Sequence, residues 1–143
     1  MNIATGSDGY LEERDCPTGD CVVGAVKRFA RELGDPANSL EERREALMFL
    51  AHFVADLHQP LHCYGEARGG NDIRLRCPDC PGDKHNLHAV WDTAFLERQQ
   101  AAPDVYARQL IEEIDDSDIT FLIRTGPEEW ATESWRLALT HAV

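Results

Sequence analysis

A histidine and an aspartate stand four residues apart at two places in this chain of 143 residues. The first pair is His52 and Asp56, and the second is His88 and Asp92. Positions i and i+4 of an α-helix lie above one another on the same face, so an imidazole and a carboxylate at this spacing can share one metal ion. A third histidine, His62, comes just after the proline that ends the first helix. The sequence therefore predicts two helices that face each other across a metal site, with His62 reaching in from the turn.

The ligand types indicate which metal this site would hold. Nitrogen and oxygen ligands without a thiolate suit zinc in an open catalytic site rather than a closed structural one. His62, His88 and Asp92 would complete a set of three ligands and leave a position for water, whereas His52 and Asp56 supply only part of a second set. Two or more metals in such a cluster would activate a water molecule and hold the oxygens that enter and leave phosphorus. The alternative is that each pair is only hydrogen-bonded at the edge of a core, but two pairs and a third histidine favour metal binding.

Helical spacing of apolar residues predicts the elements that position these ligands. The first helix runs from Cys21 to Leu33, after a loop over residues 1 to 15. The second begins at Ser39, where Glu42 three residues later forms a capping box, and it ends at about His58. Asn86 is expected to cap the helix that carries the second His–Asp pair. Further helices are predicted from about Asp104 to Ile114, from Ser117 through Leu122, and from Pro127 to the end.

The long connection from Leu61 to His85 is rich in glycine and proline, and it joins the two metal-binding helices. Within it, only Asn71 to Arg76 alternates enough to suggest a short strand or hairpin. A loop of this length in a compact domain is usually functional or disordered, and its position favours function. We therefore expect an all-α fold with a short β-hairpin in this loop, built as a single domain over residues 1 to 143.

The five cysteines leave several readings open. Cys16 and Cys21 enclose a tight loop before a helix, which favours a local disulfide in an oxidising compartment over two free thiols. Cys77 and Cys80 form a C-x-x-C, which could be a disulfide, a redox pair or half of a zinc knuckle. A knuckle would need Cys63 or His85 as well.

The charge of the chain argues against binding nucleic acid through basic residues. Its 26 Asp and Glu outnumber 14 Lys and Arg, which gives a net charge of −12, and no basic patch is visible. Affinity for a phosphate would then come from bound metal. No apolar run approaches the roughly 20 residues that a membrane-spanning helix needs. The first residues have neither the basic nor the apolar region of a signal peptide.

Three motifs together resemble the S1/P1 nuclease family. They are His52-Phe-Val-Ala-Asp56-Leu-His-Gln-Pro-Leu-His62, then Gly69-Gly70-Asn71, and then Asn86-Leu-His88-Ala-Val-Trp-Asp92. The likeness extends from about Tyr10 onward. It implies a mainly helical fold of the phospholipase C/P1 nuclease type and an enzyme that uses up to three zinc ions. Members cleave single-stranded DNA and RNA and remove phosphate from 3′-nucleotides.

The resemblance also assigns roles to residues. His62, His88 and Asp92 correspond to the complete protein ligand set of one zinc ion. His52 and Asp56 correspond to two ligands of a buried zinc, with Asp56 bridging to the third. Asn71 lies in a loop that the family uses for part of its substrate cleft.

The family pattern begins before residue 1 of this chain and continues beyond its end. The family's N-terminal ligands and its water-activating aspartate have no counterpart here, so no catalytic residue is assigned. We expect a central part of the family fold, from a secreted or periplasmic parent, with weak or absent activity alone and oligomers formed through exposed apolar faces. The alternatives are a catalytically silent metal-binding fragment and a phospholipase C-like phosphodiesterase.

Overall fold

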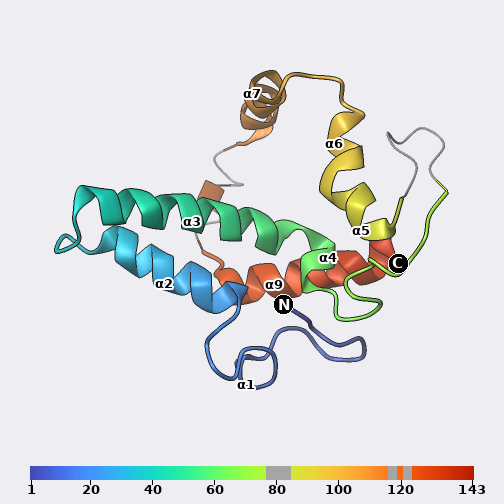
Figure 1. Cartoon of the computed structure of the whole chain (residues 1–143), viewed down its shortest axis with the longest axis horizontal. Helices are drawn as coiled ribbons and strands as arrows, with labels where there is room; N and C mark the ends of the chain where they lie inside the picture. Colours follow the sequence, from blue (N-terminus) through green and yellow to red (C-terminus); the bar gives the residue numbers. More distant parts are fainter. Residues whose placement is uncertain (77–84, 116–118, 121–123) are drawn as a thin grey trace.

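Helices dominate the computed structural model, which describes residues 1–76, 85–115, 119–120 and 124–143 (Figure 1). The long helices α2 (Val22–Gly34) and α3 (Leu40–His58) lie side by side, and α9 (Pro127–Leu137) packs against both. A short helix, α4 (Pro60–Cys63), follows α3 and also packs against α9, which is prolonged by the π-helical segment η2 (Ala138–Ala142). The prediction of an all-α fold is confirmed.

The helix that carries the second His–Asp pair consists of three consecutive segments, α5 (Leu87–Ala89), η1 (Val90–Ala94) and α6 (Phe95–Glu97). The middle segment is a π-helical turn and contains Asp92. Such turns occur inside α-helices and are frequent at functional sites. After α6 the chain reaches α7 (Pro103–Glu113), which stands apart from the α2–α3 pair in Figure 1.

The start and end of α3 follow from its sequence. The backbone N–H of Ser39 donates to a Glu42 carboxylate oxygen at 2.7 Å, and the N–H of Glu42 donates to the Ser39 hydroxyl at 3.2 Å. This is the predicted capping box, which satisfies two donors at the open end of the helix. At the other end, Pro60 has no N–H to continue the hydrogen-bond pattern, so α3 ends at His58 and Pro60 becomes the first residue of α4.

The N-terminal segment, predicted as a loop over residues 1 to 15, is irregular over most of its length but contributes to the core. Ile3 is completely buried with Val23, Leu57 and Trp135. Its N–H donates to the carbonyl of Cys63 at 2.9 Å, and its carbonyl accepts from Gly65 at 3.1 Å. Residues Glu12–Asp15 also form a one-turn helix, α1, in which Asp15 accepts from the backbone N–H of Leu11. Neither feature has a periodic pattern, because a single residue in a bridge and a single helical turn are too short to show one.

The loop between α4 and α5 contains an antiparallel bridge between Arg74 and Asn86. Leu75 donates to the carbonyl of His85 at 3.1 Å, and Leu87 donates to that of Ile73 at 2.9 Å. The predicted hairpin stays a prediction, because residues 77–84 between these segments lie outside the described residues. Cys77, Cys80 and most of the helix predicted from Ser117 through Leu122 also lie outside them.

Only part of the apolar surface of α3 is used in packing. Ala46 and Leu57 are buried, whereas Leu47 and Met48 are 53% and 64% exposed. The partly exposed Phe49 stacks on Phe29 of α2, with ring centroids 4.9 Å apart. The described helices include none that is both long and apolar enough to cross a membrane.

The burial of Ile3 yields a first prediction. Ile3→Ala is expected to lower the free energy of unfolding by about 2–5 kcal/mol, and Ile3→Val by about 0.5–1.5 kcal/mol, since each leaves a cavity in the core. Denaturant unfolding followed by circular dichroism measures the loss. Asn2→Ala is the control, because Asn2 is exposed. Equal stability of Ile3→Ala and Asn2→Ala would contradict the placement of Ile3.

Candidate metal centre

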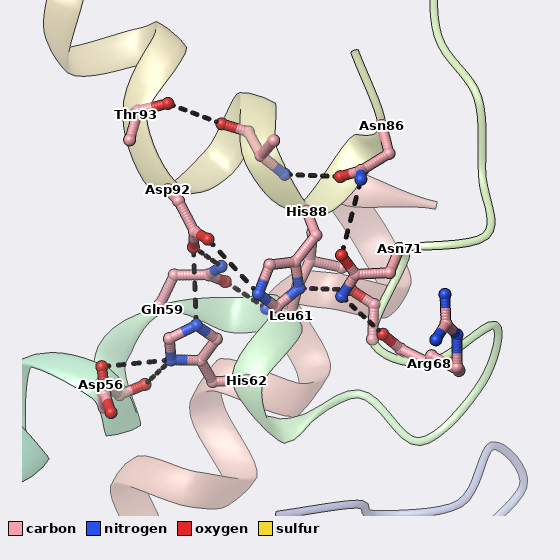
Figure 2. Close-up of polar contacts among 12 residues, drawn as sticks. Asp56, Gln59, Leu61, His62, Arg68, Asn71, Asn86, His88, Asp92 and Thr93 are labelled. Carbon is pink, nitrogen blue, oxygen red and sulfur yellow. Dashed lines mark hydrogen bonds and ion pairs between the residues drawn. The ribbon is translucent and has the colours of Figure 1, made fainter. Parts of the chain in front are cut away.

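His62, His88 and Asp92 come together in the structure as a group that could hold a metal ion (Figure 2). One ligand atom from each lies within 4.8 Å of the other two. The carboxylate of Asp92 lies between the two imidazoles: Oδ1 is 3.5 Å from Nε2 of His62, and Oδ2 is 3.4 Å from Nε2 of His88. Two nitrogens and one oxygen therefore point into one space.

Two short helices place these side chains. Pro60 starts α4 directly after α3, so His62 comes from a helix rather than from the predicted loop. Asn86 caps the second helix, as predicted, because its side-chain oxygen accepts from the N–H of Ala89 at 2.8 Å. His88 and Asp92 then lie four residues apart on the same face of that helix.

Backbone carbonyls set the orientation of both imidazoles. Nδ1 of His62 lies 3.0 Å from the carbonyl oxygen of Asp56, and Nδ1 of His88 lies 2.7 Å from that of Gly69. A carbonyl oxygen can only accept, so in each case Nδ1 carries the proton and donates it. In the neutral form of each ring, Nε2 is then the nitrogen without a proton, as metal ligation requires. The rings stack with centroids 5.0 Å apart.

The loop that supplies the carbonyl to His88 has an unusual backbone. Ala67, Arg68, Gly69 and Gly70 all have positive φ, between 46° and 82°. A Cβ on Gly69 would lie 2.8 Å from the carbonyl oxygen of Leu61 and 3.4 Å from Nδ1 of His88. Glycine at this position therefore permits both the left-handed backbone and the close approach to the histidine.

The first His–Asp pair lies beside this group. Nε2 of His52 is 3.4 Å from Oδ2 of Asp56, and His52 is 65% exposed. The other carboxylate oxygen of Asp56 is 3.5 Å from Nδ1 of His62. Among the described residues, the group that could hold an ion does not include His52 or Asp56. Asp56 links the pair to the three-residue group.

A cleft of 430 Å³ adjoins the group and is lined by residues from several elements. Asp56, His62 and His88 form part of its wall, and Arg28 and Arg68 contribute positive charge. Sequence reasoning missed both arginines, since nothing in their local pattern marks them. Asn71 does not line the cleft. Its side chain donates to the carbonyl of Arg68 at 2.9 Å and accepts from Asn86 at 3.5 Å.

The cysteines of the described residues do not add a ligand. Cys16 and Cys21 form a disulfide just before α2. Cys63 is a free, fully buried cysteine, and burial raises the pKa of its thiol to about 11. It is therefore protonated at neutral pH, and a thiol is not the form that binds zinc. This disfavours Cys63 as part of a zinc knuckle.

His58 and the tryptophans lie outside the group formed by His62, His88 and Asp92. His58 is exposed, bonds the carbonyl of Val54 at 2.7 Å and lies against the ring of Trp130. Trp135 is buried in the core, and Trp91 packs edge to face on Phe95. Trp91 and Trp135 therefore contribute to packing.

Comparisons with known proteins show which family this sequence matches. A family model described as S1/P1 nuclease matches residues 2–143. The chain is 34% identical to nuclease P1 of Penicillium citrinum over 113 residues, and this match covers 76% of the chain and 41% of that nuclease. It is 32% identical to nuclease S1 of Aspergillus oryzae over 129 residues, and this match covers 90% of the chain and 42% of that nuclease. It is 34% identical to endonuclease 2 of Arabidopsis thaliana over 135 residues, and this match covers 87% of the chain and 43% of that endonuclease. The chain thus spans less than half the length of these relatives.

The backbone of Gly69 yields a second prediction. Gly69→Ala is expected to lower the free energy of unfolding by at least about 1–2 kcal/mol, because alanine is strained at positive φ and its Cβ meets the Leu61 carbonyl. Gly34→Ala is the matched control, since Gly34 ends α2 in open space. That change is expected to be neutral or to stabilise by up to about 1 kcal/mol. Thermal or denaturant unfolding compares the two, and equal effects would contradict the loop geometry.

Proposed function

The chain belongs to the S1/P1 nuclease family, and on this premise we propose that it is part of a zinc-dependent phosphodiesterase. Its substrates would be single-stranded DNA and RNA, with phosphate release from 3′-nucleotides as a related activity. The observation that carries this proposal is the convergence of His62, His88 and Asp92 beside a cleft. Bound zinc would supply a water of lowered pKa and stabilise charge on the phosphoryl oxygens.

The two imidazole nitrogens and the carboxylate oxygen are compatible with zinc, but by themselves they do not distinguish zinc from other metals. Two imidazoles and one carboxylate also suit iron(II) in a facial triad. Membership of the family favours zinc. The role of the chain itself is to present Nε2 of both histidines and the carboxylate of Asp92 toward one space, with both Nδ1 protons held on backbone carbonyls.

Further zinc ions would need ligands beyond this group. We propose His52 and Asp56 as two ligands of a second zinc, with Asp56 bridging to a third. The 3.4 Å approach of their side chains and the place of Asp56 in the cleft wall support this. Asn71 is proposed as a substrate contact on the strength of its loop, although in this structure its side chain bonds Arg68 and Asn86.

The extent of the match limits what this chain is proposed to do alone. We propose that residues 1–143 form one partial domain, the central part of the family fold, and that the chain alone is at most weakly active. The alternative functions are a silent metal-binding fragment and a phospholipase C-like phosphodiesterase. The relatives are named as nucleases, which favours the nuclease over the phospholipase C-like phosphodiesterase.

Metal content tests the centre directly. The chain purified after zinc-replete expression is expected to contain about one zinc, measured by elemental analysis that also counts iron. His88→Ala is expected to lose it, since the ion would keep only two protein ligands. His141→Ala is the control, because His141 is exposed and contacts only Thr140 among the described residues. A folded wild-type chain without zinc would contradict the proposed centre.

Activity separates the proposed functions. Cleavage of a labelled single-stranded oligonucleotide is expected to be weak for this chain and abolished by chelation or by His88→Ala. A short-chain phosphatidylcholine, assayed alongside, is expected to stay intact. Hydrolysis of the lipid without the oligonucleotide would favour the phospholipase alternative, and zinc binding with no turnover of either would favour the silent fragment.

The exposed apolar residues of α3 support a proposal about assembly. Leu47 and Met48 are both more than half exposed, and we propose that the isolated chain self-associates through them. Leu47→Glu with Met48→Glu is expected to reduce the molar mass measured by light scattering at micromolar concentration. A wild-type chain that is monomeric would contradict this.

The Cys16–Cys21 disulfide supports a secreted or periplasmic parent, which fractionation of cells expressing the parent protein would test.

A further inference from the structure

Gln59 occupies the junction between α3 and α4 and uses both ends of its side-chain amide. It is the C-cap of α3 and the N-cap of α4. Its side-chain oxygen accepts from the backbone N–H of Leu61 at 2.5 Å, and its side-chain nitrogen donates to Oδ1 of Asp92 at 2.6 Å (Figure 2). One amide therefore connects the helix that carries His62 with the helix that carries Asp92.

Local sequence explains why the acceptor end is needed. Pro60 has no N–H, so Leu61 supplies the first free donor of α4. Leu61 is buried, with 1% of its surface exposed, which makes an unpaired N–H costly. Pro60 also restricts Gln59 to an extended backbone, at φ −80° and ψ 114°. The side chain of Gln59 then folds forward over the first turn of α4.

The donor end acts on a metal ligand. Because the amide oxygen faces an N–H, its NH₂ group must face the carboxylate of Asp92, so the orientation of the amide is determined. The Asp92 side chain is 36% exposed, and among the described residues it lies beside the two imidazoles but forms no ion pair with a lysine or an arginine. A hydrogen bond to a carboxylate is among the stronger ones in proteins. It holds Asp92 beside Nε2 of both histidines.

We propose that Gln59 is a positioning residue that fixes Asp92 relative to His62 before the metal binds. This inference rests on the proposed metal centre. Groups that orient metal ligands typically change metal affinity by about 10- to 100-fold when removed. A glutamine suits the task because the same side chain must accept at one end and donate at the other, and a hydroxyl or carboxylate at this position cannot do both over this span.

Gln59→Ser separates the two roles. Serine caps a helix well but cannot reach Asp92, so the free energy of unfolding of the metal-free chain is expected to stay within about 1 kcal/mol of wild type. Zinc affinity, measured by competition with a chromophoric chelator, is expected to fall about 10- to 100-fold. Gln59→Asn, shorter by one methylene, is expected to behave in the same way. Gln99→Ser is the control, because Gln99 is exposed and lies in a turn after α6.

A readout without metal keeps this inference distinct from the proposed function. In the ¹H–¹⁵N spectrum of the metal-free chain, the side-chain NH₂ of Gln59 is expected to resonate apart from those of Gln99, Gln100 and Gln109. In Asp92→Asn it is expected to move toward them. If wild type binds no zinc, the proposed centre fails, and this spectrum alone decides whether Gln59 holds Asp92. Unchanged zinc affinity in Gln59→Ser, or a Gln59 resonance insensitive to Asp92→Asn, would overturn the inference.

Discussion

The break in the chain at Pro60 is the constraint on which the rest of the structure depends. A continuous helix from α3 would carry His62 along the same axis as His52 and Asp56. Because proline cannot donate the next hydrogen bond, the chain ends α3 and starts α4 within two residues. The start of a new helix at Pro60 buries Leu61 in a cluster with Leu87 and Ala138, and it turns His62 toward Asp92. One residue that lacks an N–H thus fixes both a packing contact and the position of a candidate ligand.

Backbone groups, rather than charged side chains, then organise the site. The carbonyls of Asp56 and Gly69 set the tautomer of each histidine, and the absence of a side chain at Gly69 permits its close approach to His88. A carbonyl held in a packed turn has little freedom to reorganise, so both imidazoles are oriented without the ion. The strained run from Ala67 to Gly70 is consistent with this, because a backbone held at positive φ costs free energy that the surrounding contacts must offset.

The sequence predicted what depends on short spacing. The i, i+4 pairs, the capping box at Ser39, the Asn86 cap and the helices around them all follow from residues a few positions apart. It could not predict contacts that join distant segments: the bridge from Ile3 to Tyr64 spans 61 positions, and the bond from Gln59 to Asp92 spans 33. Nor could it tell which apolar residues of α3 are covered, since periodicity marks a face but not its partner. The Gln59–Pro60 pair was visible as a helix end, but its contact with Asp92 was not.

Charge explains why a phosphate site here would depend on metal. The chain carries a net charge of −12, and the arginines of the cleft each have an acidic neighbour: Arg68 bonds Asp72 at 2.9 Å, and Arg28 lies 3.9 Å from Glu32. These exposed pairs are weak, but each lowers the positive potential available to an anion. The carboxylates of Asp56 and Asp92 add negative charge at the point where a phosphate would bind. A divalent ion between these carboxylates would offset their negative charge, because a bound cation is often the largest single charge in such a site. The acidic composition and the proposed phosphodiester substrate are therefore compatible only through the metal centre.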